Sequence, residues 1–245
     1  MGQVQQQGSA ILIDGGIAGQ RLNLPLAIIL TVSLVIAAIA PFDVGFVAVT
    51  FESPVLRVML MAALVMIGAW SASQVGLRLT ASARSALIGA IGAILVAGYV
   101  VCIDCYLFRS VVPESYAQFF EQMPLGERFA YFMLRAFNEN VIYRLFVFAT
   151  ALCLLSKLTR VGAREMAPIA ILAVMVATQA LNIGMNVTAF LPGPISPLVL
   201  TYEALRYVVP GVIWAWLFWR FGFLTAEIAS VGCHLFLQPA LGILL

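Results

Sequence analysis

Long uninterrupted runs of apolar residues alternate along the chain with short polar segments. A helix that crosses a bilayer needs about 20 mostly apolar residues. By that rule the predicted spans are Leu24–Ala40, Val55–Leu77, Leu87–Phe108, Ala130–Ser156, Pro168–Phe190, Pro197–Phe218 and Leu224–Leu244. The apolar runs are continuous and do not alternate with period two, which excludes a transmembrane barrel. The pattern therefore predicts an all-α, polytopic transmembrane helix bundle of about seven spans.

The fourth predicted span is long and carries charged residues, so it is either broken or preceded by a short interfacial helix. The stretch from Val111 to Arg128 combines three glutamates with several aromatic residues, which suits a segment at the membrane surface. An eighth helix in this stretch is the alternative to seven spans. The first 20 residues are rich in glutamine and glycine and lack the basic segment of a signal peptide. We therefore expect a polar N-terminal arm (residues 1–22) and a single transmembrane helical domain (residues 23–245).

Composition supports a membrane location and sets the expected orientation. Hydrophobic residues make up 63% of the chain and charged residues 10%, whereas a soluble domain carries about 25% charged residues. The net charge of +2 and the lack of a basic cluster argue against a nucleic-acid partner, so membrane lipids are the expected surroundings. Lysine and arginine near the span ends favour a cytoplasmic N-terminus. The prediction is an integral protein of a bacterial inner (cell) membrane.

Ionisable residues inside the predicted spans need an explanation, because a charge near the centre of a spanning helix costs at least ~2.5 kcal/mol. Spacing allows structural ion pairs between Arg135 and Glu139, four residues apart, and between Glu203 and Arg206, three apart. Glu227 is close to the inner end of the last span and is expected to reach the interface. The cysteine pair near residue 104 has no histidine cluster beside it, so no metal and no cofactor is expected.

Three predicted spans carry polar groups at similar depth. The fourth has Asn138-Glu139-Asn140, the fifth has Gln179, Asn182 and Asn186, and the last has His234 and Gln238. Residues four apart share a helix face, so the fifth and last spans each present a polar stripe. A carboxylate, amides and an imidazole at one height suit either a site that activates water or a buried hydrogen-bond network. Periodicity does not separate these two interpretations.

Taken in chain order, the polar groups on these three spans resemble the motifs of the CPBP intramembrane proteases. That family includes CAAX prenyl endopeptidases and proteins linked to bacteriocin maturation and immunity. That family carries E-E-x-x-x-R on one span, F-x-x-x-H on the next and H-x-x-x-N on a late span. This chain has Glu139-Asn140-x-x-x-Arg144 for the first motif and His234-x-x-x-Gln238 for the third. The resemblance covers residues from about 130 to 245.

The chain departs from the family pattern in each motif. The second glutamate of the first motif is Asn140, and the third motif ends in Gln238 instead of asparagine. The middle histidine is missing, and by spacing Asn182 is its closest equivalent, with Asn186 second. The resemblance implies a catalytic set of Glu139, Asn182, His234 and Gln238, supported by Asn140, Arg144 and Asn186.

The resemblance implies hydrolysis of a peptide bond in a membrane-bound protein or peptide. Glu139 would act as the general base on a water, and His234 with Gln238 would stabilise the oxyanion. Arg144 would have a structural role, pairing with Glu139 or with a backbone carbonyl.

Two alternatives to a peptidase stay open. One is a family member that keeps the fold without proteolysis and acts as a membrane scaffold, immunity factor or binding protein. The other is a small-solute transporter.

Overall fold

The computed structural model describes residues 24–39, 53–187 and 196–245, and every regular element within these ranges is helical. The predicted polar arm (residues 1–22) lies outside the described residues. The helices are α1 (Leu24–Ile39), α3 (Pro54–Gln74), α4 (Ala83–Cys102), α5 (Glu114–Gln122), α6 (Leu125–Asn140), α7 (Ala149–Thr159), α8 (Pro168–Val187), α9 (Pro197–Glu203), α10 (Val209–Phe221) and α11 (Phe223–Leu244).

Three stretches of wider π-helix interrupt these α-helices. They are η2 (Ile103–Leu107), which continues α4, η4 (Val141–Phe148), which joins α6 to α7, and η5 (Ala204–Val208), which joins α9 to α10. A short 3₁₀ turn, η3 (Arg109–Val111), follows η2. The fourth predicted span is therefore a single composite helix that runs through a π-helical segment, and α5 is the separate short helix expected before it.

Five helical segments are long and apolar enough to cross a membrane: Pro54–Gln74, Ala83–Leu107, Leu125–Thr159, Pro197–Phe221 and Phe223–Leu244. The all-helical class is confirmed, and five of the seven predicted spans reach the required length. The other two coincide with the shorter helix α1 (Leu24–Ile39) and with the apolar stretch Pro168–Gly184 of α8. With 16 residues, α1 extends only ~24 Å at 1.5 Å per residue, which is less than the ~30 Å of a hydrocarbon core.

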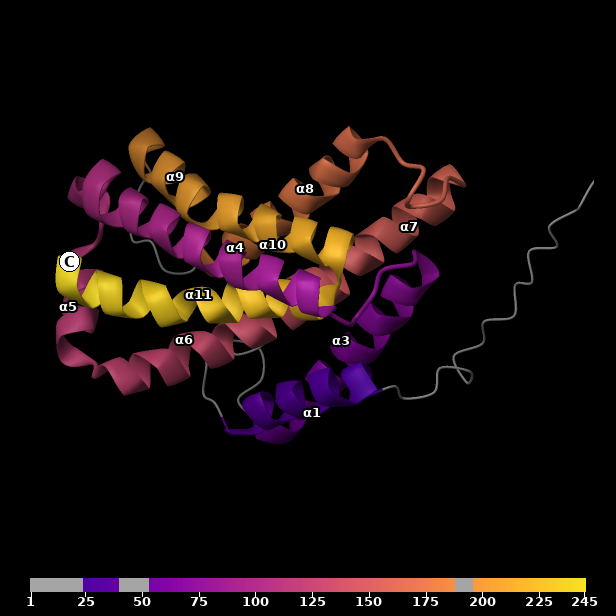
Figure 1. Cartoon of the computed structure of the whole chain (residues 1–245), viewed down its shortest axis with the longest axis horizontal. Coiled ribbons are helices and arrows are strands. Elements are labelled where there is room, and N and C mark those ends of the chain that lie inside the picture. The colour runs from indigo at the N-terminus through magenta and orange to yellow at the C-terminus, as the bar shows by residue number, and fades with distance from the viewer. Residues whose placement is uncertain (1–23, 40–52, 188–195) are drawn as a thin grey trace, which may run out of the picture.

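Helix α11 lies between α4 and α6 and packs against both (Figure 1). The close approach of α11 to α4 depends on Gly89, where a Cβ atom would lie 2.8 Å from the carbonyl oxygen of Thr225. Helix α3 packs against η4, and there a Cβ on Gly68 would lie 2.7 Å from the carbonyl oxygen of Leu145. Small residues at helix contacts are the usual means of bringing membrane helices together.

The junction between α10 and α11 is fixed by hydrogen bonds to the α3–α4 loop. The Phe223 amide donates to the carbonyl of Arg78 (2.9 Å), and the Leu224 amide donates to the carbonyl of Leu79 (3.1 Å). These bonds satisfy two of the backbone N–H groups that the start of a helix leaves without partners. The turn itself is Gly222, at φ 112°, a conformation that favours glycine.

Replacement of Gly222 by alanine is expected to destabilise the protein by about 1–3 kcal/mol, the cost of a strained backbone position. A Cβ atom there would also overlap the carbonyl oxygen of Thr80. Thermal unfolding in detergent provides the measurement. Gly98→Ala is the matched control, because a Cβ at Gly98 meets no atom within 4 Å and alanine favours a helix. Equal stability of the two variants would contradict this account of the junction.

Candidate functional site

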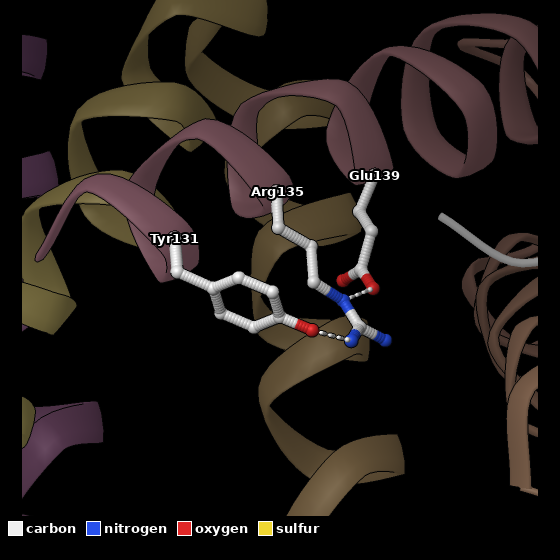
Figure 2. Close-up of polar contacts among 3 residues, drawn as sticks. All are labelled: Tyr131, Arg135 and Glu139. Carbon is white, nitrogen blue, oxygen red and sulfur yellow. Dashed lines mark hydrogen bonds and ion pairs between the residues drawn. The ribbon is translucent and has the colours of Figure 1, made fainter. Parts of the chain in front are cut away.

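Glu139 forms an ion pair with the preceding turn of its own helix. The Arg135 Nε donates to Glu139 Oε1 at 3.0 Å, and Arg135 Nη1 donates to the Tyr131 hydroxyl at 3.3 Å (Figure 2). The Arg135 and Glu139 side chains are 26% and 24% exposed. The predicted Arg135–Glu139 pair is thus confirmed. Because the pair is only partly buried, the Glu139 carboxylate is accessible while its charge is balanced.

His234 and Gln238 form the second part of the candidate site, on α11. The Gln238 Nε2 and His234 Nδ1 atoms are 3.2 Å apart, which confirms the polar stripe predicted from their spacing. The imidazole stacks on the Phe132 ring of α6, with centroids 5.5 Å apart and planes inclined by 18°. Glu139 and the His234–Gln238 pair therefore lie on two helices that pack against each other, and the α6 residue in contact with the imidazole is Phe132.

Asn140 links α6 to α11 through Glu227. Its Nδ2 donates to Glu227 Oε2 at 3.1 Å, and both side chains are buried, Asn140 fully and Glu227 with 4% exposed. The expectation that Glu227 reaches the interface is therefore wrong. Glu227 lies one turn inside α11, on a stretch that faces α6, so the neighbouring helix covers its carboxyl group. Glu227 is a site residue that spacing alone did not identify, although an acid in an apolar span was the available signal.

Arg144 joins three elements through Gln179. Its Nη2 donates to Gln179 Oε1 at 2.7 Å, and Gln179 Nε2 donates to the Tyr207 carbonyl at 3.2 Å. A Cβ on Gly211 would overlap the Gln179 side chain, so glycine at 211 makes room for it. The hydrogen bond of Arg144 goes to an amide of α8. The predicted partner of Arg144 was Glu139 or a backbone carbonyl. The partner in the structure is Gln179.

The predicted asparagines of α8 lie further along the same helix. Asn182 is buried, with 6% of its surface exposed, and comes three residues after Gln179. Asn186 falls within α8, but its side chain lies outside the described part of the structure. Gln179 is the α8 residue seen to bind η4, a role that the resemblance did not assign to it.

A separate buried cluster surrounds Arg206. Its Nη2 lies 3.0 Å from Asp104 Oδ2, and the Tyr202 hydroxyl donates to Asp104 Oδ1 at 3.1 Å. The guanidinium also lies over the rings of Tyr116 and Tyr207, 4.4 and 4.9 Å from their centroids, in cation–π geometry. Burial raises the pKa of the Tyr116 phenol, with the nearby Arg206 charge opposing the shift, so the ring facing Arg206 is neutral.

This cluster corrects the predicted ion pair between Glu203 and Arg206. Within the described residues, the ion pair of Arg206 is with Asp104, from a helix about 100 positions earlier in the chain. Arg206 belongs to the π-helical stretch η5, whose turns are wider than those of an α-helix. The spacing rule for pairs three residues apart holds only for regular α-helix, so it does not apply across this boundary.

Each of the three π-helical stretches contains a buried charged residue: Asp104 in η2, Arg144 in η4 and Arg206 in η5. Such π-helical stretches are uncommon and are often found at functional sites. Here each π-helical stretch changes the direction in which side chains point around the helix axis, and its charged side chain points toward another helix. The π-helical stretches thus place both the Arg144–Gln179 contact and the Asp104–Arg206 pair.

Replacement of Arg144 by methionine is expected to lower the free energy of unfolding by about 1.5–3 kcal/mol, the usual value of a hydrogen bond to a charged group. Gln179 Oε1 would then lose its donor. Unfolding in detergent measures the effect, with Arg84→Met as the control because Arg84 is exposed at the start of α4. Unchanged stability of the Arg144 variant would contradict the structural role.

Among the residues described, no group of three or more histidine, cysteine, aspartate or glutamate side chains is placed to hold a metal ion. Comparisons of the chain with protein-family models, curated proteins and solved structures found no match.

Proposed function

We propose that this chain is an intramembrane endopeptidase of the CPBP (CAAX protease) type, which hydrolyses a peptide bond of a membrane-associated protein or peptide. The observation that carries the proposal is that Glu139 of α6 and the His234–Gln238 pair of α11 belong to two helices that pack against each other. A partly exposed carboxylate on one helix, with an imidazole and an amide on the other, provides the groups needed for hydrolysis by water.

In this proposal Glu139 takes the proton of the attacking water. When His234 Nδ1 accepts the Gln238 amide hydrogen, the imidazole carries its proton on Nε2. That N–H is then the donor left for the oxyanion of the tetrahedral intermediate. Arg135 holds the Glu139 carboxylate in one orientation through the 3.0 Å ion pair. Asn182 would help to orient the water, in place of the histidine of the family motif.

The proposed arrangement in the membrane has seven spans and a cytoplasmic N-terminus, in a bacterial inner membrane. The five full-length segments form its main part, and α1 and α8 are the two shorter spans. The excess of lysine and arginine at the ends assigned to the cytoplasm supports this orientation. Helix α5 then lies at the membrane surface, consistent with its short length and its glutamates.

A second candidate function is binding without catalysis, as a membrane scaffold or immunity protein. It is favoured by Arg135, which balances the charge that a general base needs, and by Asn182, which cannot accept a proton where the family has histidine. In this reading the same interhelical contact holds a membrane peptide but does not cleave it.

The two functions are separated by incubating the purified protein in detergent micelles with a library of membrane-associated peptides and measuring both binding and cleavage. The variants are Glu139→Gln and, as the matched control, Glu121→Gln, which changes an exposed glutamate of α5. Cleavage that is lost in Glu139→Gln but kept in Glu121→Gln supports the peptidase. Binding without cleavage by folded wild-type protein supports the second function.

A further inference from the structure

The contact between Asn140 and Glu227 leaves two buried oxygens without hydrogen-bond partners. Asn140 Nδ2 donates to Glu227 Oε2, but Glu227 Oε1 and Asn140 Oδ1 have no partner among the described residues. Both side chains are more than nine-tenths buried. Two unsatisfied acceptors on one contacting pair are unusual, because buried polar atoms nearly always have a partner.

No cation is paired with Glu227 in the part of the chain that the structure describes. The ion pairs there are Arg135–Glu139 and Asp104–Arg206. Arg144 lies four residues after Asn140, but its guanidinium donates to Gln179. The basic residues on α4 and α10, which pack against α11, are Arg84 and Arg220, and both are exposed.

An ionised carboxylate in this position would be expensive. Burying an unpaired charge costs several kcal/mol, and a buried group that lacks a counter-ion takes up a proton instead. A proton on Glu227 also accounts for both unsatisfied oxygens at once. A carboxylic acid has one O–H donor, and a side-chain amide facing it offers one N–H and one carbonyl oxygen.

We propose that Glu227 is a proton-binding site, occupied in the resting protein and closed by Asn140. The proton comes from water and forms the O–H bond of the Glu227 carboxyl group. Oε1–H then donates to Asn140 Oδ1, while Oε2 accepts from Asn140 Nδ2. The pair is a two-point link between α6 and α11 that needs the proton to exist.

The Asn140–Glu227 link lies next to Glu139, so the proton on Glu227 affects the candidate site. Asn140 follows Glu139 directly, so the link fixes α6 next to the candidate general base. Loss of the proton would bring the Glu227 carboxylate against the Asn140 carbonyl oxygen and attract Arg144 away from Gln179. Proton occupancy thus controls the α6–α11 contact. The proposal goes beyond the peptidase function and holds whether or not the protein cleaves peptides.

Infrared difference spectroscopy of the purified protein tests the proposal at neutral pH. Besides the bands of the new glutamine amide, the spectrum of wild type minus Glu227→Gln should contain the C=O stretch of a protonated carboxylic acid, and wild type minus Glu121→Gln should contain carboxylate bands instead. A Glu227 difference with carboxylate bands and no C=O stretch of a protonated acid would overturn the proposal.

Stability provides a second readout, because glutamine reproduces both hydrogen bonds of a neutral acid. Glu227→Gln should unfold at the same temperature as wild type, while Glu227→Ala, which loses both bonds, should unfold at a lower temperature. If Glu227 is instead an ionised partner of Arg144, Glu227→Gln should be destabilised or fail to fold, and either result would contradict the proton site.

Discussion

Replacement of Asp104 by alanine is expected to lower the free energy of unfolding by roughly 3–5 kcal/mol, which is the cost of removing one partner from a buried ion pair. Asp104 is fully buried and Arg206 has 8% exposed side-chain surface. Without Asp104, the contacts left to the guanidinium among the described residues are with aromatic rings, and the Tyr202 hydroxyl loses its acceptor. The loss should be measurable as a lower unfolding temperature in detergent.

A double variant separates the cost of an unpaired charge from the cost of lost packing. Asp104→Leu combined with Arg206→Met removes both charges and keeps apolar volume, and methionine sulfur packs well against aromatic rings. The double variant should recover most of the stability lost in Asp104→Ala, because replacing a whole buried pair is often neutral. If Asp104→Ala is as stable as wild type, the cluster does not hold η2 to η5.

Replacement of Glu139 by glutamine is expected to lower the rate of peptide hydrolysis by about 10²–10⁴-fold, the usual contribution of a general base. Glutamine keeps the shape of the side chain and can accept a hydrogen bond from Arg135, so the helix contact should persist. Stability should therefore change little while turnover falls. The rate is measured on any library peptide that the wild type cleaves, and unfolding is measured on the same preparations.

Comparison with His234→Ala shows whether the two parts of the site act together. Loss of an oxyanion donor costs about 10²–10³-fold, so both variants should be slow while Glu121→Gln keeps the wild-type rate. Full activity of a folded Glu139→Gln variant would remove Glu139 from the mechanism.

The helices could be predicted from sequence because their signal is local. Each predicted span overlaps a helix or a composite helix, and the boundaries agree within a few residues, as for Leu24–Ala40 and α1 (Leu24–Ile39). Composition also predicted the membrane class. The number of full-length spans was harder to predict: the apolar run Leu24–Ala40 predicted a span, but the helix that it forms has 16 residues.

The contacts of the candidate site likewise divide into those that sequence spacing predicted and those that it did not. Arg135–Glu139 and His234–Gln238 are each four apart on regular helix, and both were predicted. Asn140–Glu227 and Arg144–Gln179 join residues 87 and 35 positions apart, and spacing contains no information about which helices face each other. The Asp104–Arg206 pair was missed for a second reason, since π-helical turns change the phase that the spacing rule assumes.

The most direct test of the proposed peptidase is mass spectrometry of membrane-peptide cleavage products formed in oxygen-18 water. If Glu139 activates water for hydrolysis, wild-type protein should release fragments whose new C-terminal carboxyl group carries one heavy oxygen, and Glu139→Gln should release almost none. A folded wild type that leaves the whole library intact, or fragments that form equally with Glu139→Gln, would contradict the proposal.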